Sequence, residues 1–338
     1  MKIAIHNAGG FAPRWIEYCK KNNIDYKIVN VYDSDIVEQV ADCDAFMWHH
    51  HHANYKDVLF AKQLLFSLQS AGKVVFPDFN TGWHFDDKVG QKYLLESIGA
   101  PLVPSYVFYT KKEALEWIEQ TDFPKVFKLR GGAGSQNVKL AHTAAEAKRF
   151  ARKSFGKGFP QYSKIDNLKE RFRKWRLGKT DFKDVLKGVV RFFDVPAFAK
   201  MHAPEKGYVY FQDFIPNNNF DTRIVVIGGE YAVAEKRFIR KGDFRASGSG
   251  VFSYESIDLN AVKIAFEIAE KLSTQSVAFD FIYDNGNPLI VEISYCFGTK
   301  GLSNAPGYWT SDMQWHEGSG FDFCGWMVEN VVKQVEKS

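Results

Sequence analysis

The chain has 338 residues, of which 45% are hydrophobic and 25% are charged. This balance is typical of a globular protein and excludes a disordered, fibrous or disulfide-stapled chain. The 44 Lys and Arg residues against 40 Asp and Glu leave a net charge of +4, too small to indicate nucleic-acid binding. No CxxC pair is present, and no apolar run reaches the roughly 18 residues of a membrane span. We therefore expect a cytoplasmic protein of two or three domains.

Short apolar runs alternate with helical periods along the first 86 residues. We expect strands at 2–5, 25–31, 44–48 and 73–77, and helices at 13–21, 35–40 and 56–71. Such alternation is typical of βαβ units around a parallel sheet. The pattern predicts a small doubly wound α/β domain over residues 1–86.

From residue 87 the pattern changes to strands that surround a glycine-rich loop. We expect helices at 87–97 and 111–120 and strands at 101–110, 125–129 and 138–140. The loop, residues 130–137, joins two strands, so it is not the strand–loop–helix of a Walker P-loop. Its glycines lack a Cβ, and their backbone N–H groups can therefore approach phosphate oxygens.

Residues 145–207 are strongly basic, with 17 Lys and Arg against 7 Asp and Glu. Aromatic residues such as Phe172 and Trp175 are interleaved with these charges. We interpret about 150–205 as a helical insertion in a central domain that spans 87–207. A solvated helical face is the favoured interpretation, and a surface for an anionic substrate, an acidic lipid or nucleic acid is the alternative.

The last third, a C-terminal domain over 208–338, is rich in strand signals. A hairpin is expected from strands at 223–227 and 230–236, across a glycine turn. Further strands are expected at 277–283 and 288–295, with helices at 259–271 and 323–335.

Two carboxylates lie on the last pair of apolar strands. Asp280 stands in Phe-Asp-Phe and Glu292 in Ile-Val-Glu-Ile, where an unpaired acid is costly to bury. If the two strands pair, both carboxylates can face one side, with Ser294 on the side of Glu292. Such oxygen ligands suit Mg²⁺, which completes its shell with water and phosphates. Acids that face solvent on an open sheet are the structural alternative.

The order of these motifs resembles the ATP-grasp superfamily of carboxylate–amine ligases. The resemblance covers about residues 85 to 298 and is carried by Asp87-Lys88, Phe123 to Lys128, Gly131 to Val138, Gln212 to Ile215, Asp221 to Gly229, Phe279-Asp280 and Val291 to Ser294. The stretch Gly242 to Gly250 resembles RimK-like members, some of which are found among surface-polysaccharide genes. The resemblance implies an α/β (α+β) ATP-grasp fold, in which a small doubly wound domain precedes two lobes of antiparallel sheet and helices that clasp ATP.

The resemblance also implies site residues. Two lysines would hold the α- and β-phosphates, the glycine loop would cover the triphosphate, and backbone groups of the 212–215 segment would bond adenine. Asp221 or Asn219 would reach the ribose. The implied ATP-binding residues are Lys88, Lys128, Gly131, Gly132, Gly134, Ser135, Gln136, Gln212, Asp213, Phe214, Ile215 and Asp221.

Asp280, Glu292 and Ser294 would bind one or two Mg²⁺ ions, with Mn²⁺ as an alternative. Ser294 stands where the family usually has Asn, which weakens or reshapes one metal site. In the implied reaction ATP phosphorylates a carboxylate, and an amine attacks the acyl phosphate. Arg245, with Arg223 and Arg237 as second candidates, would stabilise the oxyanion. No covalent nucleophile is needed, so Cys296 is not expected to act as one.

Substrate contacts are expected after the first and third strands and in the last loop, because ligands of open α/β sheets gather at strand ends. Four histidines occupy residues 49–52, and three interpretations of this run stay open: contact with an anionic substrate, a metal site, and a plain loop. The candidate substrate residues are Gly9, Gly10, His49, Ser247, Gly248, Ser249 and Tyr295.

We expect a ligase that acts on small-molecule carboxylate and amine substrates, for example an amino acid joined to a sugar-derived carboxylate in surface-polysaccharide biosynthesis. A nucleotide- or lipid-linked substrate, a homodimer and weak membrane-surface association through the basic insertion are left open. A nucleic-acid partner is not expected. The alternatives are an ATP-grasp kinase or phosphotransferase, and a non-catalytic nucleotide-binding module.

Overall fold

The computed structural model describes residues 1–132, 137–160, 203–240, 242–246 and 250–338, with short stretches between 168 and 187. These residues form two compact units. Unit 1 comprises Met1–His51, Lys56–Val103 and Ile215–Ser338, and unit 2 comprises His52–Tyr55 and Pro104–Phe214. The units thus divide at Pro104 and Phe214, whereas the expected domains divide at residues 87 and 208. The three-domain division stays a prediction, and most of the basic insertion lies outside the described residues.

Unit 1 begins with a four-stranded parallel sheet in the order β2-β1-β3-β4. Ile3 and Ile5 of β1 face one core, and Ala4 between them faces another. Helices therefore cover both faces, as a doubly wound domain requires. The elements are β1 (Lys2–His6), α1 (Ala12–Lys21), β2 (Asp25–Val29), α2 (Ile36–Gln39), β3 (Ala45–Met47), α3 (Tyr55–Ser70), β4 (Val74–Phe76), α4 (Phe79–Gly82) and α5 (Lys88–Ser97).

Unit 1 also contains an antiparallel sheet in the order β13-β12-β9-β10-β14-β15, with β11 on β10. The tight β9–β10 turn is made by Gly228 and Gly229, whose φ angles of +62° and +70° few other residues adopt readily. The expected glycine-turn hairpin is thereby confirmed. The strands are β9 (Phe220–Ile227), β10 (Tyr231–Phe238), β11 (Phe252–Ser253), β12 (Ser276–Asp284), β13 (Asn287–Ser294), β14 (Gly307–Thr310) and β15 (Trp315–Glu317).

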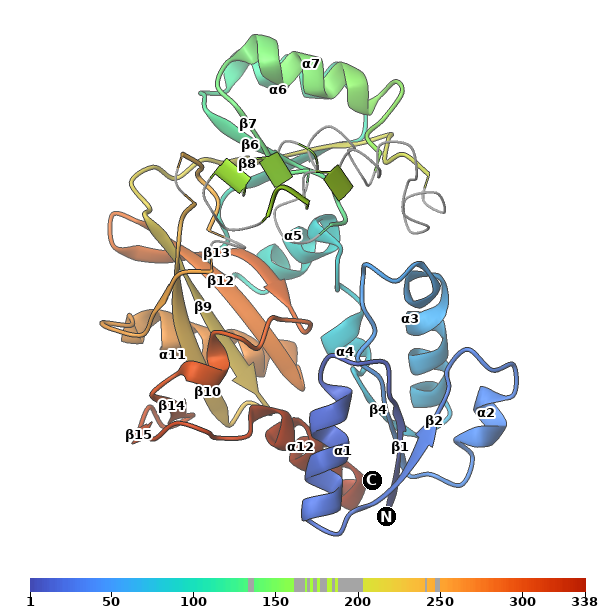
Figure 1. Ribbon diagram of the computed structural model, residues 1–338. Helices are drawn as coiled ribbons and strands as arrows, with labels where there is room; N and C mark the ends of the chain where they lie inside the picture. The colour runs from blue at the N-terminus through green and yellow to red at the C-terminus, as the bar shows by residue number, and fades with distance from the viewer. Residues whose placement is uncertain are drawn as a thin grey trace. The chain divides into compact units, whose positions relative to one another are not determined.

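The two faces of this sheet pack against different partners. Helix α11 (Leu259–Leu272) covers the face that carries Ile224 and Phe279. The opposite face carries Val225 and Ala278 and shares a core with α1 and α12 (Phe323–Lys337), two helices that lie side by side in Figure 1. The short helix η1 (Leu302–Asn304) adds to the same core.

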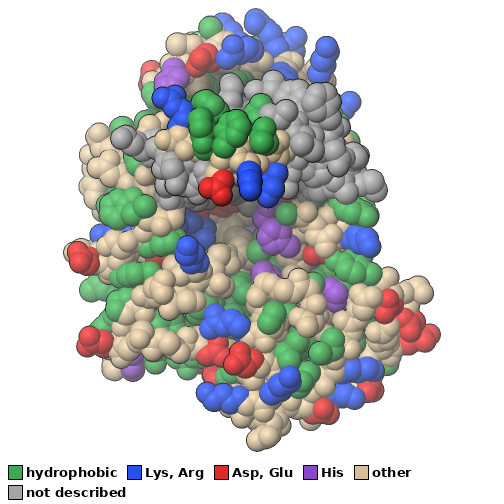
Figure 2. Space-filling model, viewed as in Figure 1, with side chains coloured by type: hydrophobic (Ala, Val, Ile, Leu, Met, Phe, Trp, Pro, Cys, Tyr) green, Lys and Arg blue, Asp and Glu red, His purple; other side chains and the backbone are tan. Residues whose placement is uncertain are grey.

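Unit 2 is a four-stranded antiparallel sheet covered on one face by two helices. The strand order is β5-β8-β6-β7, and Figure 1 shows α6 and α7 together on one side. Figure 2 shows Lys and Arg side chains over these helices, and α7 contributes exposed Arg149, Arg152 and Lys153. The elements are β5 (Ser105–Phe108), α6 (Lys111–Gln120), β6 (Lys125–Lys128), β7 (Lys139–Ala141), α7 (Ala144–Ser154) and β8 (Val209–Asp213).

Candidate functional site

A row of ionisable side chains crosses four neighbouring strands of unit 1. Glu292 of β13 pairs with Asp280 of β12, and Asp280 pairs with Arg223 of β9. Arg223 in turn pairs with Glu235 of β10. Directly opposed residues of antiparallel strands project from the same face, so all four side chains share one side of the sheet. This face is the one that carries Val225 and Ala278 closer to the core.

Asp280 is the centre of an ion-pair network. Arg223 donates to both of its carboxylate oxygens, from Nε at 2.8 Å and from a terminal nitrogen at 3.0 Å. Arg237 lies 2.8 Å from Oδ2 of Asp280 and forms a second bidentate pair with Asp221, with both bonds 2.7 Å long. Burial opposes ionisation of Asp280, but the two arginines outweigh it and hold the pKa of this carboxyl below its usual range.

Glu235 was missed by the sequence analysis, and its surroundings are unusual. Its side chain is only 2% exposed, and Oε2 has no hydrogen-bond partner among the described residues. Burial raises the pKa of Glu235 to about 7, although Arg223 and Arg237 offset part of that effect. The signal in the sequence was its position two residues before Arg237, which places both on one face of a strand.

Lys88 reaches this face from the first turn of α5. Asp87 caps the helix by accepting a hydrogen bond from the Gly90 N–H at 2.9 Å, which fixes Lys88 as the first helical residue. The Nζ of Lys88 lies 3.2 Å from Oε1 of Glu292, and its side chain is buried. The structure therefore brings together six predicted site residues: Lys88, Asp221, Arg223, Arg237, Asp280 and Glu292.

The carboxylates Asp280 and Glu292 fit a Mg²⁺ ion in chemistry and placement. They are oxygen ligands opposed on adjacent strands, and Mg²⁺ in nucleotide enzymes commonly takes one or two carboxylates plus phosphate oxygens. The hydroxyl of Ser294, two residues after Glu292, donates to the carbonyl of Cys296 at 2.8 Å. Within the described ranges, no cluster of three or more His, Cys, Asp or Glu side chains is arranged to hold a metal. Phosphate oxygens would have to complete the shell.

His49 and Cys296 meet where β3 and β13 end. Nδ1 of His49 accepts the backbone N–H of Phe11 at 3.0 Å, so the proton of the neutral ring sits on Nε2. Nε2 lies 3.1 Å from the sulfur of Cys296 and donates to it. Burial and neighbouring His51 lower the pKa of His49 to about 3, and burial raises that of Cys296 to about 12. The pair is neutral, as expected of a thiol that is not a nucleophile.

The other predicted substrate residues are placed as follows. Gly10 lies against His49, since a Cβ on Gly10 would come within 1.8 Å of its Nδ1, and Gly9 precedes it with a φ of +88°. Tyr295 is fully buried and donates to the carbonyl of His50 at 2.5 Å, so its placement gives no support to a direct substrate contact. Arg245 pairs with Asp243 at 2.6 Å. Ser247, Gly248 and Ser249 lie outside the described residues.

Unit 2 holds Lys128, Gln212, Asp213 and Phe214 of the predicted nucleotide residues. The Nζ of Lys128 lies 2.6 Å from the side-chain oxygen of buried Gln212, whose amide nitrogen donates to Ser105 at 3.0 Å. Asp213 pairs with Lys125 at 2.6 Å. Phe214 ends unit 2, and Ile215 resumes unit 1.

The start of the glycine loop also lies in unit 2. The carboxylate of Glu205, another residue that the sequence analysis missed, accepts the backbone N–H groups of Arg130 at 3.1 Å and Gly131 at 3.2 Å. Gly132 follows with a φ of +107°. Gly134, Ser135 and Gln136 lie outside the described residues.

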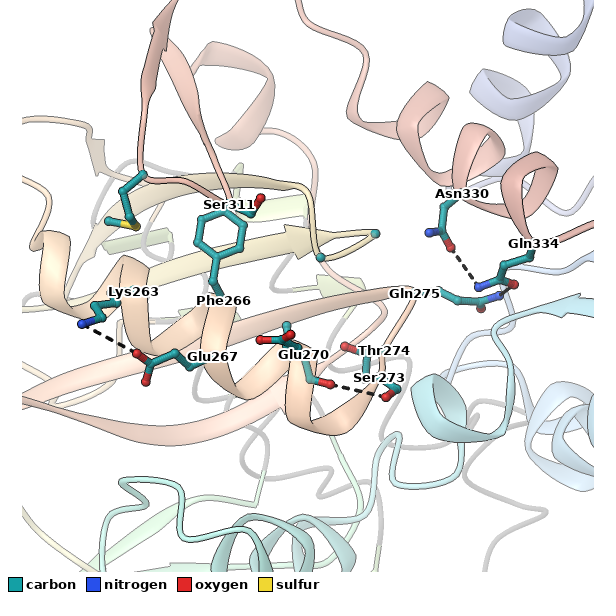
Figure 3. Close-up of a pocket in the computed structure, with 14 residues that line it drawn as sticks. Lys263, Phe266, Glu267, Glu270, Ser273, Thr274, Gln275, Ser311, Asn330 and Gln334 are labelled. Carbon is teal, nitrogen blue, oxygen red and sulfur yellow. Dashed lines mark hydrogen bonds and ion pairs between the residues drawn. The ribbon is translucent and has the colours of Figure 1, made fainter. Parts of the chain in front are cut away.

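A separate cavity of about 640 Å³ lies at the far end of β9 and β10, between α11 and α12 (Figure 3). None of the predicted site residues lines it. Its labelled polar side chains mostly bond one another, as Lys263 does with Glu267 and Asn330 with Gln334.

Among the helices formed by described residues, none has both the length and the apolar character needed to cross a bilayer.

Comparison with known sequences identifies part of the chain. Residues 198–308 match a family described as the RimK-like ATP-grasp domain. Over 116 residues, or 33% of this chain, the sequence is 28% identical to the ribosomal protein bS6–L-glutamate ligase of Escherichia coli O139:H28. The chain covers 37% of the length of the curated relatives that it matches. The resemblance to RimK-like ATP-grasp proteins is thus confirmed for the segment that contains β9, β10, β12 and β13.

Comparison with solved structures extends the likeness to the whole chain. A RimK domain ATP-grasp protein of Sphaerobacter thermophilus has a TM-score of 0.57 at 15% identity, covering 98% of this chain and 100% of its own. The biotin carboxylase domain of Hydrogenobacter thermophilus 2-oxoglutarate carboxylase, solved with MgADP, ADP and bicarbonate, has a TM-score of 0.58 at 14% identity. The match covers 98% of this chain and 69% of that one. The predicted ATP-grasp fold is therefore confirmed.

Proposed function

We propose that the chain is an ATP-dependent ligase that activates a carboxylate as an acyl phosphate and joins it to an amine. The observation that carries this proposal is the opposed pair Asp280 and Glu292, which shares one sheet face with Arg223 and Arg237 and has Lys88 beside it. The RimK-like match covers the strands on which this pair lies, and the matched relative is a ligase that acts on L-glutamate.

The chemical problem is that a carboxylate is resonance-stabilised and negatively charged, so it resists attack by an amine. Transfer of the γ-phosphoryl group from ATP to a carboxylate oxygen breaks the β–γ bond, releases ADP and creates a phosphate leaving group. The cations of this face, Lys88 and Arg223, would hold the phosphates in line and neutralise charge as it develops. Mg²⁺ held by Asp280 and Glu292 would supply further neutralisation of the phosphate oxygens.

In the second half of the reaction, the free amine forms a bond to the acyl carbon, and the negative charge moves to the acyl oxygen, so a guanidinium must lie close by. The C–O bond then breaks, phosphate leaves, and the nitrogen gives up a proton to solvent. We assign this role to Arg245, with Arg223 and Arg237 as second candidates. Lys128, Gln212 and Asp213 of unit 2 would contribute to nucleotide binding.

For the substrates we propose a small carboxylate and an amine, with an amino acid or amine joined to a sugar-derived carboxylate as the specific pair. The amino-acid half is supported by the match to an L-glutamate ligase. Surface-polysaccharide synthesis, a nucleotide- or lipid-linked substrate, a cytoplasmic location and a homodimer belong to the same proposal.

A hydroxylamine trap tests the ligase activity. The full chain, MgATP and hydroxylamine would be incubated with amino acids, short peptides and nucleotide-linked uronic acids, and ADP and hydroxamate would be followed together. We expect equal amounts of ADP and hydroxamate with one carboxylate, because hydroxylamine intercepts an acyl phosphate before the natural amine is known.

Two outcomes would contradict the proposal. A phosphorylated product that accumulates with ADP and without hydroxamate would indicate a phosphotransferase. Nucleotide binding with neither ADP nor hydroxamate from any acid would indicate a non-catalytic module. A Glu292→Ala control run beside the wild type should form no hydroxamate.

A further inference from the structure

Glu235 is an acidic residue placed where the network around Asp280 has no evident need for it. Arg223 already pairs with Asp280, and Arg237 pairs with both Asp221 and Asp280. Glu235 lies directly across from Arg223 on the neighbouring strand, and on the side of Arg223 opposite to Asp280. Arg223 is therefore flanked by two carboxylates but bonds only one of them.

The structure keeps Glu235 buried although its Oε2 has no hydrogen-bond partner in the part of the chain that the structure describes. A Cβ on Gly301 would come within 1.7 Å of Oε2 of Glu235, so the 301 position admits only glycine while this carboxyl stays in place. Tyr254 holds the same loop by donating to the carbonyl of Gly301 at 2.7 Å. A buried carboxylate with an unused oxygen destabilises a fold, and such groups call for a functional explanation.

Asp280 supplies that explanation, because it pairs with two arginines and is also a proposed ligand of the divalent cation. Both of its oxygens now accept hydrogen bonds from arginines. A divalent cation on Asp280 would compete for those oxygens and repel the guanidinium of Arg223. Together, Asp221, Asp280 and Glu235 against Arg223 and Arg237 leave one excess negative charge when all are ionised. This face therefore favours an added cation, provided that the guanidinium of Arg223 finds another carboxylate acceptor once the cation binds Asp280.

We propose that Glu235 is a positioning residue that receives the guanidinium of Arg223 when a divalent cation occupies Asp280, and so keeps Arg223 on the face of the sheet where the phosphates bind. This inference rests on the proposed function for the identity of the cation site. The side chain of Arg223 is 17% exposed, so it has little room to leave by turning into solvent. Across β9 and β10, Glu235 is its cross-strand neighbour and the acceptor with an unused oxygen.

The test compares Glu235→Gln with wild type in two measurements, neither of which is turnover. The first is thermal unfolding at pH 8 in EDTA without nucleotide. The variant should melt at the same or a higher temperature than wild type, because it loses a buried unpartnered charge. The second is binding of Mn²⁺ with ADP, followed by the electron paramagnetic resonance of free Mn²⁺. Mn²⁺ should bind on the order of tenfold more weakly, as for other residues that orient metal ligands.

Glu255→Gln is the matched control, because Glu255 is an exposed glutamate just after β11, and it should leave both measurements unchanged. Glu235→Asp should recover part of the Mn²⁺ affinity. A lower melting temperature for Glu235→Gln in EDTA, or unchanged Mn²⁺ binding, would overturn the proposal and leave Glu235 a structural residue. Failure of wild type to bind Mn²⁺ with ADP would reject it as well. Absence of hydroxamate with normal Mn²⁺ binding would instead reject only the ligase activity.

Discussion

Lys88 and Glu292 form an ion pair, with Nζ and Oε1 3.2 Å apart, although 204 positions separate them in the chain. The lysine side chain is 6% exposed and that of the glutamate 32%. A lysine is seldom buried this deeply without an anion beside it, so Glu292 stabilises the buried position of Lys88. The predicted phosphate ligand and the predicted metal ligand therefore depend on each other before any nucleotide binds.

This dependence makes Glu292→Gln an informative substitution. The amide keeps the shape of the side chain but removes the charge that faces both Lys88 and the proposed cation. We expect hydroxamate formation with MgATP to fall by a factor of about 10² to 10³, the usual effect of losing one preorganised electrostatic contact. The melting temperature should change by only a few degrees.

Asp284→Asn is the matched control for Glu292→Gln. Asp284 is exposed at the end of β12, on the same hairpin, and its carboxylate accepts a hydrogen bond from the neighbouring side chain of Asn285. Its removal should leave turnover unchanged. Wild-type turnover in Glu292→Gln would mean that the site has been assigned to the wrong face.

In unit 2, Lys128→Met should weaken nucleotide binding. Lys128 is buried on β6 with its Nζ on the side-chain oxygen of Gln212, so its position is fixed before phosphate arrives. Loss of one charge-assisted hydrogen bond, worth about 1.5–3 kcal/mol, should raise the KM for MgATP by about 10- to 100-fold. Lys112→Met on the exposed face of α6 should leave the KM unchanged. Equal KM values for the two variants would remove Lys128 from the nucleotide site.

Most of the secondary structure could be predicted because it is local. The helix expected at 111–120 is observed as Lys111–Gln120, and Thr110 caps it by accepting the Glu113 N–H. The hairpin of β9 and β10 follows from two apolar runs around Gly228-Gly229. The strand expected at 101–110 is shorter, Ser105–Phe108, because residue 103 instead bonds the carbonyl of Ile290 in unit 1.

The pairing of site residues could be predicted only in part. Asp280 and Glu292 belong to one hairpin, so their opposition follows from its register. The contact between His49 and Cys296 joins residues 247 positions apart, and no local pattern indicates it. Glu235 was overlooked because it stands in an apolar strand beside Lys236, where its orientation depends on which face of the sheet is buried.

Glu235 should also give the fold a measurable pH dependence. Burial raises its pKa from 4.5 to about 7, with Arg223 and Arg237 opposing the rise. The folded state therefore holds the proton more tightly than the unfolded chain does. This contribution to stability is fully present below about pH 4.5 and is lost as the pH rises through 7. Over that pH range, the contribution of Glu235 to the free energy of unfolding falls by about 3 kcal/mol.

Urea unfolding of wild type and Glu235→Gln at pH 5 and pH 8 checks this expectation. The amide does not titrate. From pH 5 to pH 8, the free energy of unfolding of the variant should therefore rise by on the order of 2–3 kcal/mol relative to that of wild type. The Glu255→Gln control should follow wild type at both. If the free energy of unfolding changed equally between the two pH values in wild type and Glu235→Gln, Glu235 would not be held in an environment that opposes its ionisation.

Cys296 should be a slow thiol despite its histidine neighbour. Burial raises its pKa from 9.0 to about 12, with Arg223 opposing the rise. The Nε2–H of neutral His49 donates a hydrogen bond to the sulfur, so the ring does not act as a base toward the thiol. At pH 8 the thiolate fraction, and with it the alkylation rate, should be about a thousandfold below that of an ordinary cysteine. Iodoacetamide labelling followed by peptide mass spectrometry, with a cysteine peptide as reference, measures this rate. Cys296→Ala should keep hydroxamate formation within a few-fold of wild type. Rapid labelling together with loss of activity in Cys296→Ala would instead mean that the thiol takes part in the chemistry.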